Sequence, residues 1–148
     1  MILEQPKPQD NLKPIKFELL NKNFIKQIDD CLAVSFNADY SIVAAGCHRL
    51  IKIYEFRQGI LKEIQILNQR NSGVSTLYFM RKSNQFISGD MKGSIFLWAR
   101  NHVNQWTCSY RDNQHNVNIN YLIMNNNEDT MISSSDYKTK YQTKQMGL

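Results

Sequence analysis

The sequence predicts an all-β protein, an incomplete β-propeller made of four-stranded antiparallel meander blades. Two observations carry this prediction. Short apolar segments alternate with turns rich in Asn, Asp, Gly and Ser, and no window keeps the apolar spacing of an amphipathic helix. The same pattern of landmark residues also recurs with a period of 43 to 45 residues, and a period of about 40 to 45 is typical of propeller blades.

The first 27 residues are expected to form an N-terminal arm. Residues 1–14 are polar and contain all three prolines, which favours an extended chain. IKFELL, residues 15–20, is a candidate first strand. The arm lacks the apolar run of a signal peptide, and no segment approaches the roughly 20 apolar residues that cross a bilayer, so we expect no membrane partner.

Residues 28–148 are expected to form the propeller segment, because landmark residues recur along it at one spacing. First-copy and second-copy landmarks stand 43 or 44 positions apart, and third-copy landmarks follow 45 positions later. The pairs are Phe36 and Phe79, Gly46 and Gly89, Tyr54 and Trp98, then Phe79 and Met124, and Ser88 and Ser133.

This spacing predicts blades at about 28–68, 69–112 and 113–148. The first two blades each contain four segments with strand patterns, the outermost of which alternates between apolar and polar residues. The third blade is expected to be unfinished, since Lys140, Tyr141, Gln142 and Thr143 stand where an apolar strand should follow. The segment therefore holds about two and a half blades, whereas a closed ring needs four to eight.

The second copy carries the most specific motif, a small pair Ser88-Gly89, a turn at Gly93 and then Ile95-x-Leu97-Trp98. His115 stands nine residues before Met124. With these residues the segment 28–139 resembles the WD-repeat family of β-propellers, with degenerate repeats.

The resemblance implies a buried hydrogen-bonded set in each blade, formed by a histidine, a Ser or Thr, a turn aspartate and the tryptophan. No copy holds all four. In the second copy Lys92 stands where the aspartate is expected and Arg70 where the histidine is expected. The first copy offers Ala45, His48 and Tyr54. Apolar burial is nevertheless the larger stabilising contribution, so the fold is still expected.

The sequence contains none of the motifs that would indicate an enzyme. It lacks Gly-x-Ser-x-Gly, a phosphate-binding Gly-rich loop and His-Glu-x-x-His. His102, Cys108 and His115 could converge on zinc, but their spacing matches no known metal motif. We therefore expect no catalysis, no cofactor and no metal.

Charge and cysteine usage constrain partner and compartment. The net charge of +5 comes from Lys and Arg residues scattered singly, apart from a looser group at Lys138, Lys140 and Lys144, so a nucleic-acid partner is not favoured. The three cysteines are odd in number and far apart, which predicts reduced thiols. We expect a cytoplasmic protein, with the nucleus as the second compartment.

Resemblance to the family implies a protein-interaction scaffold that binds other proteins through loops at the narrow face of the ring. Mapped onto this sequence, the candidate contact residues are His48, Arg49, Arg70, Asn71, Lys92 and His115. Rigid display of several loops lowers the ordering cost when a partner docks.

Several alternatives remain open at this point. The chain can be a subunit of a multiprotein assembly, such as the one that builds cytosolic iron–sulfur clusters, or a basic propeller associated with nucleic acid. It can also be a truncated duplicate without a function. Open apolar faces at both ends further predict self-association or completion of the ring by another chain.

Overall fold

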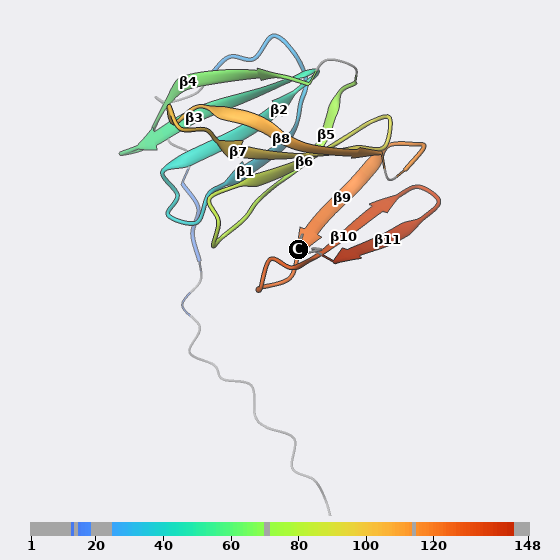
Figure 1. Cartoon of the computed structure of the whole chain (residues 1–148). Helices are drawn as coiled ribbons and strands as arrows, with labels where there is room; N and C mark the ends of the chain where they lie inside the picture. The colour runs from blue at the N-terminus through green and yellow to red at the C-terminus, as the bar shows by residue number, and fades with distance from the viewer. Residues whose placement is uncertain (1–12, 14, 19–24, 70–71, 114, 144–148) are drawn as a thin grey trace, which may run out of the picture.

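The computed structural model describes residues 13, 15–18, 25–69, 72–113 and 115–143, and every regular element among them is a strand (Figure 1). The strands form three antiparallel sheets in which neighbours in the sequence are neighbours in space. The predicted all-β architecture of an incomplete propeller is confirmed. No helix of the described part is long and apolar enough to cross a membrane.

The first and second sheets are complete four-stranded meanders. The first contains β1 (Cys31–Phe36), β2 (Ile42–Cys47), β3 (Leu50–Arg57) and β4 (Ile60–Asn68). The second contains β5 (Val74–Phe79), β6 (Phe86–Asp90), β7 (Ser94–Arg100) and β8 (Trp106–Asn113). β2 is buried along its whole length, because its small and β-branched side chains fit on a surface covered from both faces.

The third sheet contains β9 (Ile119–Met124), β10 (Thr130–Ser135) and β11 (Thr139–Thr143). Lys140 and its neighbours, which lack the apolar pattern expected for the next strand, nevertheless belong to a strand, since β11 pairs with β10 along five residue pairs. The backbone ladder supplies the hydrogen bonds of a strand whatever its side chains are. Polar residues can therefore form the third strand of this sheet. β11 is more exposed than β3 and β7, the third strands of the other two sheets.

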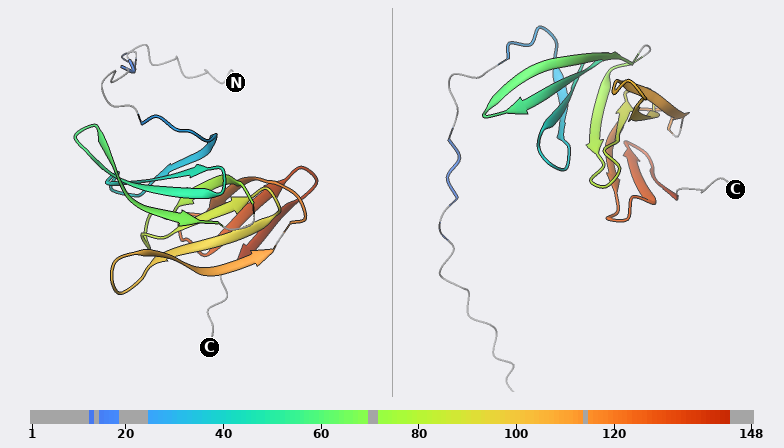
Figure 2. Two further views of the ribbon diagram at one scale, coloured as in Figure 1. Left: turned by 90° about the horizontal axis from the view of Figure 1, so that it is seen from above. Right: turned by 60° about the vertical axis from the view of Figure 1, so that its left-hand side comes forward.

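The three sheets lie side by side in chain order, as two further views show (Figure 2). Their first strands, β1, β5 and β9, contact one another in succession, and the outermost strands β4 and β8 also meet. This is the radial stacking of propeller blades, in which each sheet covers one face of the next.

Two glycines of the repeat allow this close stacking. A Cβ atom on Gly46 would lie 2.5 Å from Cγ1 of Val74, in the first strand of the next sheet. One on Gly89 would lie 2.9 Å from Cγ2 of Ile119, again in the first strand of the next sheet. The 43-residue spacing of the two glycines therefore marks the same backbone approach at both junctions.

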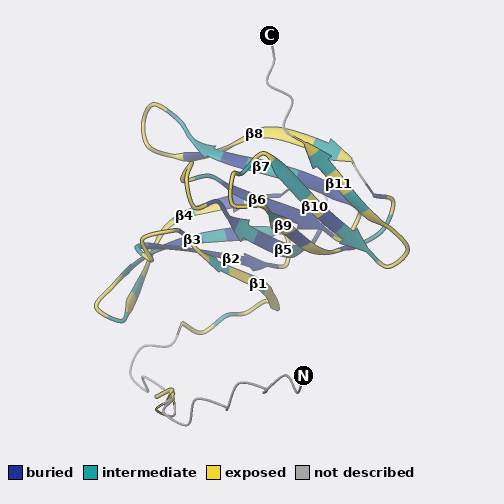
Figure 3. Ribbon diagram, turned by 90° about the horizontal axis from the view of Figure 1, so that it is seen from below, coloured by how far each residue is buried: buried dark blue, intermediate teal, exposed yellow. Residues whose placement is uncertain are grey.

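Buried residues are concentrated on strands such as β2, β5 and β6 (Figure 3). The junction of the first and second sheets holds the larger cluster, which includes Ile51, Ile53, Phe86 and Trp106. The junction of the second and third sheets holds a smaller cluster around Ile87, Ile95, Ile119 and Leu122.

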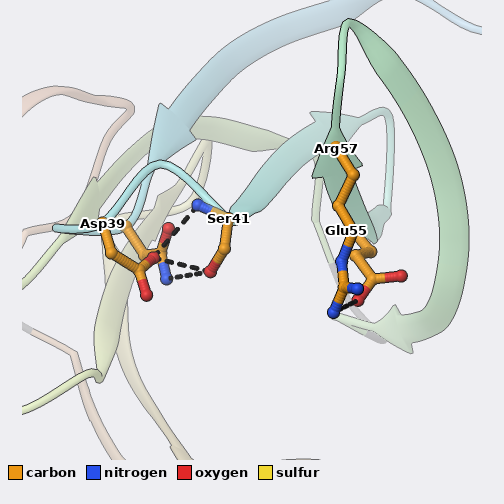
Figure 4. Close-up of polar contacts among 5 residues, drawn as sticks. Asp39, Ser41, Glu55 and Arg57 are labelled. Atoms are coloured by element: carbon orange, nitrogen blue, oxygen red, sulfur yellow. Dashed lines mark hydrogen bonds and ion pairs between the residues drawn. The ribbon is translucent and has the colours of Figure 1, made fainter.

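Polar contacts close the hairpins at one edge of the first sheet (Figure 4). Oδ1 of Asp39 accepts hydrogen bonds from the backbone N–H of Ser41 at 3.0 Å and from its hydroxyl at 2.6 Å. These bonds hold the pKa of Asp39 below its usual value. Arg57 and Glu55 form an ion pair at 2.9 Å beside the next turn. Polar groups at this edge are therefore paired with neighbours close in the sequence.

The candidate first strand in the N-terminal arm is not observed where the structure describes it. Residues 15–18 carry no strand, and Phe17 is 94% exposed. Leu19 and Leu20, the remainder of that candidate, lie outside the described residues.

Candidate protein-interaction face

Turns from all three sheets gather at the edge opposite the hairpins of Figure 4. We call this edge the turn face and define it by the turns at 48–49, 91–93 and 136–138, with the segments 72–73 and 115–118 that enter β5 and β9. In each meander these turns join the second strand to the third. The candidate contact residues that the structure describes belong to this face.

Backbone hydrogen bonds fix the turns relative to one another in a repeated pattern. The N–H of His48 donates to the carbonyl of Asp30 at 3.0 Å, and the His48 carbonyl accepts from Val74 at 2.7 Å. In the next sheet Met91 donates to Gly73 at 3.0 Å, and the Gly93 carbonyl accepts from His115 at 3.0 Å. Each of these two turns is therefore held between the entry segments of its own sheet and the next.

His48 and Arg49 form an exposed turn, as a binding loop requires. His48 adopts a left-handed conformation with φ of 53°, which turns the chain between β2 and β3. The Arg49 carbonyl accepts a hydrogen bond from Gln69 at 2.9 Å, so the backbone is fixed while the side chains remain exposed to solvent.

Lys92 is exposed at the second turn, beside exposed Met91. The sequence analysis expected the turn aspartate at the position that Lys92 occupies. The structure shows that Asp90, at the end of β6, has this role instead. Oδ1 of Asp90 accepts from the N–H groups of Lys92 at 2.9 Å and Ser94 at 2.8 Å, and Asp90 is only 1% exposed. Gly93 has a φ of 90°, and a Cβ atom there would collide with the His115 carbonyl. The turn is therefore a rigid support for Lys92.

The structure contradicts the assignment of His115 as a contact residue. Its side chain is only 5% exposed, and Nε2 lies 2.8 Å from the hydroxyl of Ser133. Burial lowers the pKa of His115, and the charges of Lys140 and Lys138 lower it further. A buried imidazole cannot touch a partner, so His115 ties the entry segment to β10 instead.

A comparable tie exists in the second sheet. Nε1 of Trp98 donates to the Ser88 hydroxyl at 2.9 Å, and Ser88 donates to Oε1 of Gln69 at 3.0 Å. Gln69, and not Arg70, therefore stands where the resemblance led us to expect a histidine. Within the described residues Nε2 of Gln69 is buried without a hydrogen-bond partner, which is the cost of replacing an imidazole by an amide.

The first sheet uses Gln27 in the same place. Nε2 of Gln27 donates to the hydroxyl of Tyr54 at 3.1 Å, and Lys52 donates to Oε1 of Gln27 at 2.7 Å. Ala45 stands where the second sheet has Ser88 and has no hydroxyl, so Tyr54 bonds the Gln27 amide directly. His48, offered for this role by the sequence, is exposed and does not take part. The spacing of 42 and 46 residues between Gln27, Gln69 and His115 was the signal that sequence reasoning missed.

The remaining residues of the turn face carry mixed charge. Arg49, Lys92, Asp136 and Lys138 of this face are exposed, and so is Asp30, whose carbonyl accepts the hydrogen bond from His48 beside it. Tyr137 in the third turn is 83% exposed and was not among the predicted contact residues. The predicted residues Arg70 and Asn71 lie outside the described residues. Among the residues that the structure does describe, no group of three His, Cys, Asp or Glu side chains is placed to hold a metal ion.

The two outer sheets each present an apolar face to solvent. On the first sheet the exposed side chains are Leu32, Val34 and Phe36. On the third sheet they are Tyr121, Ile123, Ile132 and Tyr141. The equivalent faces of the inner junctions are covered by a neighbouring sheet, so both outer faces can take a further layer.

No family model matches the sequence, and no curated protein matches it either. Solved structures do match. A chain of the crystal structure of the mitotic checkpoint complex superposes with a TM-score of 0.66 over 75% of this chain, at 14% identity. Sqt1 of Saccharomyces cerevisiae superposes with a TM-score of 0.64 over 74% of this chain, at 17% identity.

Both neighbours are WD40-type propellers, so the similarity shows that this chain has a propeller-like fold. The chain spans 36% and 30% of the lengths of the two matched chains.

Proposed function

We propose that this chain is a protein-docking scaffold that binds its partner through the turn face, and that its role is binding rather than catalysis. The observation that carries the proposal is the repeated set of backbone hydrogen bonds through His48, Met91 and Gly93. These bonds hold the backbones of two separate turns, which carry exposed side chains, in fixed relative positions. A partner that docks on them does not have to order the loops first, which lowers the cost of binding.

The charge pattern supports a protein partner. Arg49 and Lys92 are interspersed with Asp30 and Asp136 on the same edge. A surface that binds polyanions would present a cluster of cations, whose affinity falls steeply with salt. Mixed charges beside an exposed aromatic residue such as Tyr137 fit a folded protein surface better.

The proposal is tested by removing three side chains of the turn face without changing its backbone. The variant Arg49→Ala, Lys92→Ala, Tyr137→Ala is compared with wild type in quantitative affinity capture from extract of the source cells. We expect recovery of a defined set of proteins to fall at least about tenfold, because a few central side chains usually carry most of the binding energy.

A matched control changes exposed residues at the opposite edge, Arg81→Ala, Lys82→Ala and Asn126→Ala. This variant should recover the same proteins as wild type. Equal recovery by both variants would place the partner elsewhere. Recovery that is abolished by nuclease and weakens steeply with salt would identify nucleic acid as the partner and contradict the proposal.

A further inference from the structure

A cleft of about 750 Å³ opens between the second and third sheets, away from the turn face. Ile87, Ile95 and Leu97 line it from the second sheet, and Met124 and Met131 line it from the third. Such a volume is within the range of sites that bind side chains or small ligands.

The equivalent place at the first junction is filled by Trp106, which is 2% exposed. The ring of Trp106 lies 5.6 Å from that of Phe79 and 5.0 Å from that of Phe86. Gln65 clamps its backbone, accepting from the Trp106 N–H at 2.9 Å and donating to its carbonyl at 2.8 Å. The residues 45 positions after Phe79, Phe86 and Gln65 are Met124, Met131 and Tyr110, and all three line the cleft.

Trp106 reaches its place because it begins β8, the fourth strand of its sheet. β8 pairs with β7, as β4 pairs with β3. In the third sheet β11 pairs with β10, and no strand of the described part pairs with the other edge of β11. The cleft and the open edge of β11 therefore lie where a fourth strand and its tryptophan lie in the second sheet.

The charged residues that line the cleft are all carboxylates, namely Asp112, Glu128 and Asp129. Glu128 accepts hydrogen bonds from the N–H groups of Lys82 at 2.6 Å and Ser83 at 3.2 Å. These donors are backbone N–H groups, which carry no charge and so leave the charge of the Glu128 carboxylate itself uncompensated by them. Although burial acts to raise it, the hydrogen bonds leave the pKa of Glu128 below its usual value.

We propose that this cleft binds an extended segment of another protein, which adds to β11 as a fourth strand, inserts an aromatic side chain between Met124 and Met131, and carries Lys or Arg beside it. Strand addition supplies backbone hydrogen bonds, and the pocket supplies side-chain selectivity. The inference rests on the equivalence with Trp106 and does not depend on the turn face being a binding surface.

The chain itself provides the probe. A synthetic peptide of residues 104–113 with Cys108→Ser is titrated into the isotope-labelled full chain, and amide chemical shifts are followed. We expect shifts concentrated on β11 and around Met124 and Met131. The same peptide with Trp106→Ala should bind at least about tenfold more weakly, because the indole is the anchor. The peptide with Asp112→Lys should bind more tightly at low salt.

A matched pair of chain variants locates the site. Met131→Trp fills the cleft and should abolish peptide binding. Ile132→Trp places the same ring on the exposed face of the same strand and should leave binding unchanged. Thermal melting monitored by circular dichroism confirms that both variants fold.

Three outcomes would overturn the proposal. They are absence of binding at millimolar peptide, equal binding of the Trp106→Ala peptide, and shifts at the first junction, which would mean that the peptide displaces β8. Concentration-dependent self-association that competes with the peptide and disappears in Met131→Trp would assign the cleft to a second copy of the chain instead.

Discussion

The two junctions between sheets share one backbone geometry but differ in packing. At the first junction Phe79, Phe86, Trp98 and Trp106 form a continuous aromatic cluster. At the second junction Met124, Met131 and Gln142 occupy the positions of Phe79, Phe86 and Trp98. The second junction therefore retains an open cleft where the first has a closed core.

The difference is confined to the outer part of each junction. Near the propeller axis, Val74 packs on Gly46 and Ile119 packs on Gly89 in the same manner. Toward the periphery, the first junction adds a tryptophan anchored by Gln65, whereas the second ends at Gln142, which bonds Asp112 across the cleft at 3.3 Å. The inner contacts, which are alike, thus set the relative placement of adjacent sheets. The outer contacts, which differ, determine how much each junction contributes to stability.

The largest expected effect comes from removing the residue that closes the first junction. Trp106→Ala should lower the free energy of unfolding by about 3–5 kcal/mol, the range for deleting a buried large aromatic side chain. Met131→Ala at the second junction should cost less, because its side chain already borders open space. Urea unfolding followed by circular dichroism measures both.

Trp106→Phe is the control, since it keeps an aromatic ring and should lose a smaller part of the stability. If Trp106→Ala and Met131→Ala cost the same, the two junctions would be equally packed in solution, and the contrast between them would fail.

The second-largest expected effect is a loss of stability from adding a methyl group at either junction, and we expect this loss to be equal at the two junctions. Gly46→Ala and Gly89→Ala each place a methyl group against the next sheet, 2.5 Å from Val74 and 2.9 Å from Ile119 respectively, and the second methyl also lies 2.8 Å from Thr76 of its own sheet. Overpacking of this kind typically costs about 1–3 kcal/mol. Thermal unfolding of both variants should show similar losses, with Gly73→Ala, which would meet only the flexible side chain of Met91, as a milder control. A loss confined to Gly46→Ala would mean that the third sheet does not pack on Gly89.

The repeat, the strand order and the inner contacts could be predicted from the sequence, because they depend on periodicity and on small residues at fixed spacing. Phe36, Gly46 and Gly89 identified the copies without reference to any contact between them. The third strand of the last sheet was missed because strand pairing depends on backbone hydrogen bonds, and polar residues such as Lys140 and Gln142 give no apolar signal.

The buried ties were misassigned for a different reason. The sequence analysis put the histidine position of the second copy at Arg70 and therefore expected no complete tie there. The structure places an amide there instead, in Gln69, and another in Gln27. Glutamine and histidine can both donate and accept a hydrogen bond, but they are different residue types in a sequence comparison. Only the contacts with Ser88 and Tyr54 show that Gln69 and Gln27 have equivalent roles.

The smallest expected effect is a pH dependence near neutrality from the buried tie of the third sheet, which the glutamine ties of the other two sheets lack. Burial and the charges of Lys140 and Lys138 lower the pKa of His115 below its usual value of 6.5. Because the unfolded chain then binds a proton more readily than the folded one, the stabilisation from neutral His115 is present above pH 6.5 and is lost as the pH falls toward the lowered pKa. Melting temperatures at pH 7.5 and pH 5.5 should therefore differ, with lower stability in acid.

His115→Gln provides the decisive comparison, because glutamine fills the same position in the other two sheets and does not titrate. The variant should fold and should lose the part of the pH dependence that belongs to His115. Other groups respond in the same direction, since Asp39, Glu128 and Asp129 also have lowered pKa values. Those carboxylates, however, titrate below the range in which His115 changes charge. A pH profile between 5.5 and 7.5 that is identical in wild type and His115→Gln would show that the imidazole is not buried against Ser133, and the third sheet would then be looser than its contacts indicate.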